Sequence, residues 1–315
     1  MVDYNTPMDV FTHFDEPLHA LWDAAMTHES VPWPFFTFTW HQHWHDHFSD
    51  NEQLMIMSDT KNQVIIPVSI RDRTAHFTGG EEIADYLDAV GTSTHKAAAW
   101  QEAVLLLKEQ GVSALLLRNI PEGSPTIDAL LPLTDVQITQ EDTTPILTLP
   151  DSFDDYLSSL DRKDRHELKR KMKKFEAEHP ALSFVPRTGN STDMPSLLRL
   201  MRLDTDKAAF LTREMTGFFE TLPSVFPGDI WQFVLMQQDT IIATTLAFRV
   251  RDSLLLYNSG FDPDYPGAGW YIKAKTINWA IEQSVRSYNF LQGNERYKYD
   301  LGAKDSAVYR ISVPL

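Results

Sequence analysis

The chain has 315 residues, 43% of them hydrophobic and 11% aromatic, which is an ordinary globular composition and enough for two domains. Its net charge of −16 argues against a general affinity for nucleic acid or anionic membranes, because both require a positive field. The absence of cysteine excludes disulfides, thiolate nucleophiles and cysteine-ligated zinc.

The N-terminal stretch MVDYNTPMDVFTHFDE lacks the basic start and apolar core of a signal peptide. No apolar run in the sequence approaches the ~18–20 residues that would span a bilayer. We therefore expect a cytoplasmic protein without membrane insertion.

The first half of the chain is expected to alternate helices with strands. Apolar residues at helical spacing, among them Leu18 and Trp22, predict a helix over 16–28, and the aromatic-rich stretch 33–48 is expected to end in another. Strands over 53–58 and 63–70, a helix from Thr92 or Ser93 to Gly111 and a strand over 114–120 follow. We place a domain boundary near Pro150, which gives domains 1–150 and 151–315.

The second half is expected to form a meander followed by a helix and further strands. The expected elements are helices from about 152 and over 161–178, a strand over 182–187, a helix over 191–208, strands over 231–237, 241–250 and 253–261, a helix from 266–269 to about 286, and strands at 288–292 and 306–313. This order favours an α/β (α+β) fold with mixed, mostly antiparallel sheets flanked by helices, and it fits a Rossmann or TIM-barrel fold poorly.

A glycine-containing turn, Pro266-Gly267-Ala268-Gly269, joins the third strand of the meander to the following helix. Glycines let backbone N–H groups approach an anion closely, and a helix N-terminus adds partial positive charge. The turn therefore suits a pyrophosphate. An ordinary turn with a glycine N-cap would have the same sequence.

A polar and aromatic segment, Gln292–Asp300, follows the strand expected at 288–292. Sites are often built from such loops at strand ends. Lys298 is a candidate for holding a phosphate or carboxylate, and Glu295 or Asp300 for accepting a proton from an attacking amine. The alternative is a solvated loop with an internal salt bridge.

Residues 162–174 form a basic island in the acidic chain. Eight cations and two carboxylates give this window a charge of +6, so the rest of the chain carries −22. Arg162, Arg165 and Lys169 are spaced three and four apart on one side of the expected helix, where they could clamp phosphates. The other cations are expected on a solvated face, opposite a stripe that includes Leu168, Met172 and Phe175.

Four histidines alternate along residues 41–47, so that two pairs have the i,i+4 spacing of metal ligands. No third ligand is evident from the spacing. We expect no metal site, and interpret the histidines as a polar helix face anchored by Trp40, Trp44 and Phe48.

The order and spacing of these features resemble the CelD/BcsL-like acyltransferases, a group of the GNAT superfamily related to the Fem-type peptidyltransferases. The resemblance extends over most of the chain. It rests on PFFTFTWHQHW at 34–44, IIPVSI at 65–70, TGGEEIADYLDAV at 78–90, LDRKDRHELKRKMKKF at 160–175, the strands at 231–261, PGAGWYIKAKTINWAI at 266–281 and NFLQGNERYKYDL at 289–301.

The resemblance implies a tandem pair of GNAT-like units and assigns several site residues. Gly267, Ala268 and Gly269 match the GNAT pyrophosphate turn, although Tyr265-Pro266 stands where that turn usually begins with Arg or Gln. We also expect Trp270 and Tyr257 to contribute to the donor site. Tyr297 and Lys298 match the aromatic-lysine pair of Fem-type relatives, while Arg165 and the pair Asp85 and Tyr86 match residues of the CelD-like group.

The implied reaction is transfer of an acyl group from acetyl-CoA or another acyl-CoA to an amine of a small molecule, sugar or cell-envelope precursor. Backbone N–H groups near 257–260 are expected to polarise the thioester carbonyl. One alternative is aminoacyl-tRNA-dependent peptidyl transfer, which would make tRNA the one nucleic-acid partner. Another is a non-catalytic tandem-GNAT binding module. Both a monomer and a homodimer are compatible with the sequence.

Overall fold

The computed structural model describes residues 8–48 and 52–315, which fall into two compact units. Unit 1 extends to Thr143 and also includes Ser306–Leu315, whereas unit 2 is Thr144–Asp305. Each unit has its own mixed sheet. This contact-based division differs from a single boundary at 150, because the C-terminal strand returns to the first sheet.

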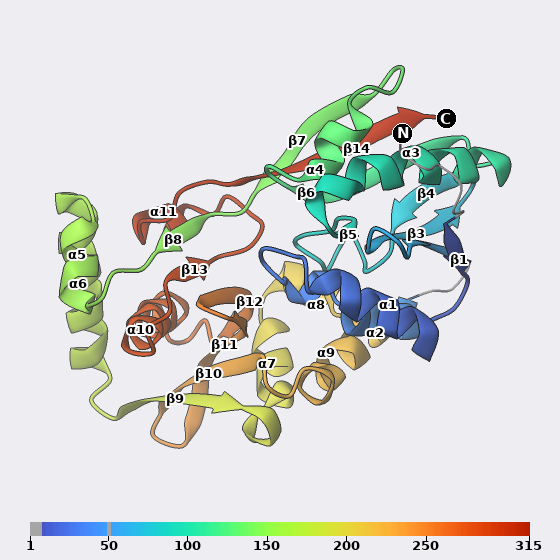
Figure 1. Ribbon diagram of the computed structural model, residues 1–315. Helices are drawn as coiled ribbons and strands as arrows, with labels where there is room; N and C mark the ends of the chain where they lie inside the picture. The colour runs from blue at the N-terminus through green and yellow to red at the C-terminus, as the bar shows by residue number, and fades with distance from the viewer. Residues whose placement is uncertain (1–7, 49–51) are drawn as a thin grey trace. The chain divides into compact units, whose positions relative to one another are not determined.

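The sheet of unit 1 has the order β1-β2-β3-β4-β6-β14-β7, with β5 paired to β3. Its pairings are antiparallel except between β4 and β6. In Figure 1 the red strand β14 runs alongside the green strand β7, although the two are far apart in sequence. The strands are β1 (Asp9–Phe11), β2 (Gln53–Asp59), β3 (Val64–Arg71), β4 (Thr74–Phe77), β5 (Val90–Gly91), β6 (Ala114–Pro121), β7 (Gln137–Thr143) and β14 (Ala307–Pro314).

Four α-helices and a 3₁₀ turn accompany this sheet in the described part of unit 1: α1 (Glu16–Met26), η1 (Pro34–Phe36), α2 (Phe38–Phe48), α3 (Ser93–Glu109) and α4 (Pro125–Leu130). The helices expected from the sequence before strand β6 are all present, and Gly111 adopts a positive φ of 77° just after α3, as a glycine C-terminal signal predicts. On α2, His41 is buried beside Thr78, and burial lowers its pKa to about 3, so it is a neutral core residue.

The sheet of unit 2 has the order β8-β13-β12-β11-β10-β9. The antiparallel meander β9 to β12 confirms the expected second-half pattern, and the pairing of β12 with β13 is parallel. Two-residue polar turns at 238–239 and 251–252 join the long strands, and Gln238 and Arg251 have positive φ there. The strands are β8 (Ile146–Thr148), β9 (Leu182–Thr188), β10 (Ile230–Gln237), β11 (Thr240–Val250), β12 (Ser253–Phe261) and β13 (Ser287–Asn289).

The helices of unit 2 include α10, which packs against β10, β11 and β12 and contacts α6 (Figure 1). Phe175 of α6 stacks on Tyr271 of α10 with ring centroids 4.9 Å apart, and both join the main core of this unit. The described helices are α5 (Phe153–Ser159), α6 (Arg162–Glu178), η2 (Gly189–Ser191), α7 (Met194–Met201), α8 (Thr205–Phe210), α9 (Arg213–Val225), α10 (Ala268–Glu282) and α11 (Arg296–Asp300).

Two sequence expectations in this unit are wrong. The helix expected over 191–208 is divided into α7 and α8, because Asp193 and Asp204 each accept backbone N–H bonds and start a new helix. The segment 292–300, expected as a loop, ends in the short helix α11. Helix α9, capped by Thr212, was not anticipated.

The two mixed, mostly antiparallel sheets flanked by helices confirm the predicted α/β (α+β) class. Within residues 8–48 and 52–315, no helix combines the length and the apolar character needed to cross a membrane.

Candidate active site

Strand β12 loses its parallel neighbour midway along its length. It pairs with β13 only over Ser253–Leu255 and then continues to Phe261. On its other side a β-bulge at Tyr257 shifts the register with β11, since Leu246 pairs with Asn258 and Ala247 with Leu256. Bulges and separating strands commonly occur beside active sites, where they re-aim backbone and side chains.

The glycine turn that follows β12 has two distinct geometric requirements. Gly267 is the N-cap of α10 and has φ of 97°, a left-handed conformation that favours glycine. At Gly269, an added Cβ would lie 2.5 Å from the ring of Phe261, so the helix can pack this closely on β12 only without a side chain. The N–H of Ala268 already donates to Tyr265 O at 3.0 Å. The turn therefore presents Gly267 outward while Ala268 and Gly269 are buried.

A pocket of about 300 Å³, hereafter the turn pocket, lies between this turn and α6. Gly267 and Trp270 line one side, and Arg170, Lys171 and Lys174 line the other. The Lys171 ammonium lies 4.9 Å from the centre of a Trp270 ring. The buried Nε1–H of Trp270 has no hydrogen-bond partner among the residues described. The turn pocket thus combines cations with a glycine N-cap.

The cations of the turn pocket are partly engaged by carboxylates. Arg170 donates to both carboxylate oxygens of Glu167, and Lys171 lies 3.7 Å from the same carboxylate. Lys174 lies 3.6 Å from Glu178. The side chains of the three cations are 39–62% exposed, and exposed pairs of this kind contribute little to stability. They therefore remain accessible to a stronger anion.

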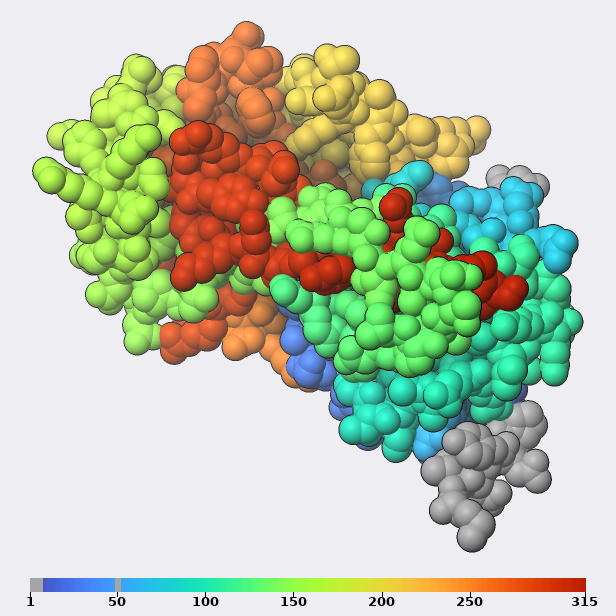
Figure 2. All heavy atoms as spheres, turned by 90° about the horizontal axis from the view of Figure 1, so that it is seen from above, coloured from blue at the N-terminus to red at the C-terminus, as the bar shows by residue number. Residues whose placement is uncertain are grey.

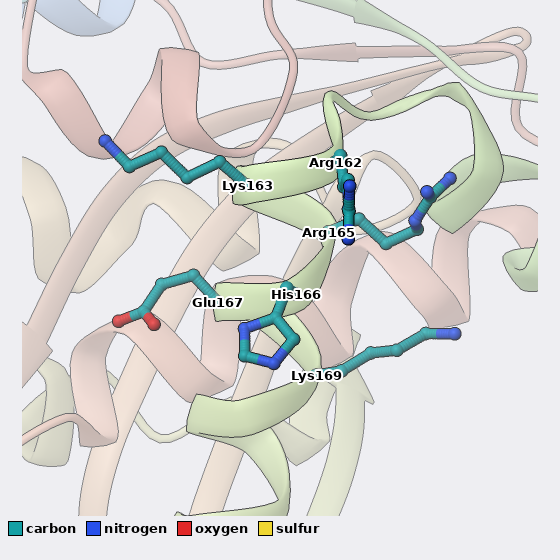
Figure 3. Close-up of a pocket in the computed structure, with 6 residues that line it drawn as sticks. All are labelled: Arg162, Lys163, Arg165, His166, Glu167 and Lys169. Atoms are coloured by element: carbon teal, nitrogen blue, oxygen red, sulfur yellow. The ribbon is translucent and has the colours of Figure 1, made fainter.

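Arg162, Arg165 and Lys169 lie elsewhere on α6. They line a separate, open groove of about 720 Å³ together with Lys163, His166 and Glu167, hereafter the helix groove. Arg165 and Lys169 extend to one side of the helix, whereas Lys163 and Glu167 extend to the other (Figure 3). The yellow-green residues that include α6 form a broad exposed surface (Figure 2). The structure thus assigns different halves of the basic helix to the turn pocket and to the helix groove.

Lys298 is buried, with a side chain only 2% exposed. Its ammonium donates to the carbonyl oxygens of Leu291, Gln292 and Gly293 at 3.2, 2.7 and 2.9 Å, and lies 2.9 Å from Glu295 Oε2. An ammonium has three N–H donors, so these acceptors use all of them. Lys298 therefore fixes the segment after β13 and has no donor left for a ligand.

Tyr297 and Glu295 lie beside Lys298. Burial raises the pKa of Tyr297, with a further contribution from the Glu295 charge, so its hydroxyl stays protonated. Burial would also raise the pKa of Glu295, but the hydrogen bond and charge of Lys298 outweigh it and lower that pKa. The Glu295 side chain is 57% exposed, which makes it an ionised and reachable carboxylate.

Asp300 is separated from this group. It lines a pocket of about 210 Å³ with residues that include Trp270 and Arg296, and its carboxylate lies 3.5 Å from Arg296 Nε. Of the four residues expected to carry the chemistry, the structure brings Glu295, Tyr297 and Lys298 together, and directs Asp300 toward α6.

Two lysines that the sequence reasoning did not select complete the neighbourhood of Glu295. Lys273, on α10, donates to Gly269 O at 3.0 Å, lies 3.5 Å from Ser259 Oγ, and has its ammonium 4.8 Å from the Tyr297 ring centre. Lys207, on α8, donates to Ser259 O at 2.5 Å. A lysine between the apolar residues Ile272 and Ala274 was the available signal for Lys273, since it lies on a helix that is apolar nearly all round.

The remaining predicted residues lie apart from these pockets. The ring of Tyr257 stacks on Phe219 at 5.7 Å and contacts Phe248. Tyr86 is buried in unit 1 and stacks on Trp33 at 5.2 Å, and Asp85 beside it is half-buried. Their expected roles in ligand binding stay predictions. Among the described residues, no group of three or more His, Asp or Glu side chains has an arrangement that could hold a metal ion.

Comparisons with known proteins agree with this architecture. Residues 162–299 match the model of a family described as "Acetyltransferase (GNAT) domain". The match begins at α6, includes the meander, the glycine turn and α10, and ends within α11, so it covers both the turn pocket and Lys298. No curated protein matches the sequence.

Several solved structures share the fold. FemX is 11% identical, with a TM-score of 0.63, and the match covers 98% of each chain. L-PGS from Bacillus licheniformis is 12% identical, with a TM-score of 0.62 over 97% of this chain and 94% of that one. A tandem GNAT protein from the clavulanic acid biosynthesis pathway is 12% identical, with a TM-score of 0.52 over 96% and 97%. The chain thus shares the fold of these proteins, and its residues 162–299 are similar to the GNAT acetyltransferase family.

Proposed function

We propose that this protein is an N-acyltransferase that moves an acyl group from acyl-CoA to an amine of a small-molecule, sugar or cell-envelope acceptor. The observation that carries the proposal is the turn pocket, where the N-cap Gly267 faces Arg170, Lys171 and Lys174. The reaction centre is placed in the second half of the chain, within the proposed domain 151–315. A cytoplasmic location belongs to the same proposal.

Electrostatics favours the turn pocket as the site of the CoA phosphates. Acyl-CoA carries about four negative charges, and the chain carries −16, so binding requires local cations that overcome the long-range repulsion. Lys171 and Lys174 supply point charges, and Arg170 supplies a planar guanidinium suited to phosphate. We therefore propose that the 3′-phosphate binds nearer to Lys174 than to Arg162, Arg165 or Lys169.

The proposed chemistry is direct transfer. The amine nitrogen attacks the thioester carbonyl, the C–N bond forms, the C–S bond breaks, and CoA leaves as the thiol. Backbone N–H groups in the part of β12 that has lost its neighbour β13 are proposed to stabilise the oxyanion. Glu295 is the proposed acceptor of the amine proton, since its carboxylate is ionised and exposed. Lys298 and Tyr297 hold Glu295 and the segment after β13 in position.

Ligand binding tests this proposal directly. Isothermal titration with acetyl-CoA, longer acyl-CoAs and unacylated tRNA should give saturable binding of the CoA thioesters. In separate thermal unfolding experiments, these thioesters should raise the melting temperature as their concentration increases. Gly269 is unsuitable for mutagenesis, because any side chain there would collide with Phe261. A protein that binds no CoA thioester would contradict the assignment.

The helix groove supports a second candidate function, aminoacyl-tRNA-dependent transfer. Four cations line it (Arg162, Lys163, Arg165 and Lys169), and polyanions bind such surfaces by counterion release. This candidate predicts that tRNA binds, with a steep salt dependence, and that Arg165→Glu abolishes the binding. The acidic remainder of the chain favours acyl-CoA over tRNA.

Membership of the CelD/BcsL-like group is part of the proposal as well. It is supported by Arg165 in the basic helix before the meander and by the sequence pair Asp85-Tyr86. Transfer activity with any amine would separate the enzyme from a non-catalytic tandem-GNAT binding module, which would bind the donor and release no CoA.

A further inference from the structure

Two lysine side chains from different helices converge on Ser259. Lys207 donates to the Ser259 carbonyl oxygen at 2.5 Å, and Lys273 lies 3.5 Å from the Ser259 hydroxyl. In the sequence, the whole meander separates the two lysines. The fold therefore brings them together, and a local sequence pattern does not. Lys273 is 6% exposed and Lys207 is half-buried.

The surrounding charges leave this pair unbalanced. Lys298 adds a third ammonium, while Glu295 is paired with Lys298 at 2.9 Å. Asp204, the other nearby carboxylate, accepts the backbone N–H bonds of Asp206 and Lys207 at the start of α8. Within residues 8–48 and 52–315, neither Lys207 nor Lys273 has a carboxylate within salt-bridge distance. Buried cations without a counter-charge are costly, so the arrangement favours a bound anion or loss of a proton.

Both ammonium groups retain donors that an anion could use. The one hydrogen bond described for Lys207 goes to Ser259 O, and Lys273 has one short bond, to Gly269 O at 3.0 Å. The Ser259 hydroxyl, 3.5 Å from the Lys273 ammonium, has an O–H group of its own that could also donate. Lys298 differs, since carbonyl oxygens already use all its donors.

The location ties this pair to the reaction centre. Ser259 is in the part of β12 that continues beyond its pairing with β13, next to the bulge at Tyr257. Lys273 is one helical turn after Gly269, and Tyr297 and Glu295 lie beside it. An anion held here would therefore lie at the same part of β12 whose backbone is proposed to stabilise the oxyanion.

We propose that Lys207, Lys273 and Ser259 bind a compact oxyanion of the acceptor, either a carboxylate or a phosphate monoester close to the reacting amine. That the bound anion belongs to the acceptor rests on the proposed function. The existence of the anion site does not. It narrows the acceptor class to amino-acid-like molecules or phosphorylated amines, and disfavours amines that carry no acidic group.

Proton uptake provides a signature specific to this site. Burial, followed by the charge of Lys207, lowers the pKa of Lys273 to about 7, with Glu295 opposing and Lys298 reinforcing the shift. A bound anion must raise that pKa, because it stabilises the ammonium form. At pH 8, where Lys273 is mostly neutral, oxyanion binding should therefore take up close to one proton per site.

The test uses the full chain with acetate and inorganic phosphate as probes, titrated calorimetrically at pH 8 in buffers of different ionisation enthalpy. Lys273→Met and Lys207→Met remove one cation each, and Lys207 is half-buried, so its variant keeps the test available if Lys273→Met fails to fold. Lys275→Met is the matched control on the same helix. Lys171→Met/Lys174→Met controls for phosphate that binds in the turn pocket.

We expect proton-coupled anion binding that weakens at least tenfold in Lys207→Met and Lys273→Met, and changes less than twofold in Lys275→Met and in the Lys171/Lys174 variant. Coupling with acetate would assign the site to carboxylates, and coupling with phosphate alone to phosphate monoesters. Anion binding that is unchanged in both Lys207→Met and Lys273→Met would overturn the inference. The same holds if neither acetate nor phosphate binds. Neither result depends on acyl-CoA, so failure of the proposed function, seen as no CoA binding, would be distinguishable.

Discussion

The cations of the turn pocket lie in a different environment from the lysine cluster (Lys207 and Lys273) and from Lys298 beside it. Side chains of Arg170, Lys171 and Lys174 are 39–62% exposed, whereas Lys298 is 2% and Lys273 is 6% exposed. Exposed cations keep their charge and act through a field that salt screens. Buried cations must be met by carbonyl oxygens, as Lys298 is, or lose affinity for the proton, as Lys273 does.

This difference in solvent exposure suits the two regions to different kinds of ligand binding. The turn pocket is suited to capture a highly charged ligand from solution, because its cations reach solvent. The lysine cluster is suited to discriminate among small ligands. Its ammonium groups are shielded from water, so a small anion that enters supplies the counter-charge that they lack.

The largest effect is expected at Lys298. Replacing it with Met leaves three carbonyl oxygens without their donor, so the free energy of unfolding should fall by about 3–5 kcal/mol. Denaturant unfolding measures this, with Lys275→Met as the control of equal side-chain change. A loss below about 1 kcal/mol would show that the carbonyl oxygens are solvated, and that Lys298 is available to a ligand after all.

Charge reversal in the turn pocket should have the next largest effect. Lys171→Glu/Lys174→Glu is expected to weaken acyl-CoA binding about 100-fold, or about 2.8 kcal/mol, since two attractive contacts become repulsive. Lys173→Glu is the control, because Lys173 is exposed on the same helix and does not line the turn pocket. If acyl-CoA affinity fell equally in both variants, binding would depend on the overall charge of the helix and not on the turn pocket.

The buried lysine predicts a pH dependence of stability. Its pKa is about 7 in the folded chain and ordinarily 10.5, so between these values the unfolded state binds more protons and stability rises with pH. Compared with Lys273→Met, the native protein should gain about 1 kcal/mol per pH unit between pH 7 and 9. Unfolding curves at several pH values measure the difference. A difference that stays constant with pH would mean that Lys273 titrates normally.

Salt should distinguish the regions by the smallest effect. Raising the ionic strength from about 0.05 to 0.5 M should weaken acyl-CoA binding about tenfold, because the turn pocket cations are exposed. Oxyanion binding at the lysine cluster should weaken less, since buried charges are screened less. Titrations at several salt concentrations measure how the affinity of each site depends on ionic strength. A steeper dependence at the lysine cluster than at the turn pocket would contradict the prediction.

Much of the framework could be predicted from the sequence. Hydrophobic periodicity and turn residues predicted β2, β3, α3 and the meander β10 to β12, and the Gly267–Gly269 turn predicted the start of α10. These features depend on neighbours a few residues apart. The basic helix was also evident, although its cations divide between two cavities that the spacing of Arg162, Arg165 and Lys169 did not reveal.

Long-range contacts account for what was missed. Lys207 lies on α8, a helix that required Asp204 to be identified as a cap, and it meets Lys273 only through the folded sheet. The return of β14 to the first sheet depends on pairing with β6 and β7, far earlier in the chain. No local pattern specifies which strand edge a final segment joins.

Amine-dependent release of the CoA thiol is the most direct measure of acyl transfer by this protein. The native protein, mixed with acetyl-CoA and a panel of neutral, carboxylate-bearing and phosphorylated amines, should release thiol stoichiometrically with N-acetylated product, and release should fall sharply in Lys171→Glu/Lys174→Glu. The account would be contradicted if acetyl-CoA and longer acyl-CoAs released no thiol with any amine while tRNA bound saturably at the helix groove.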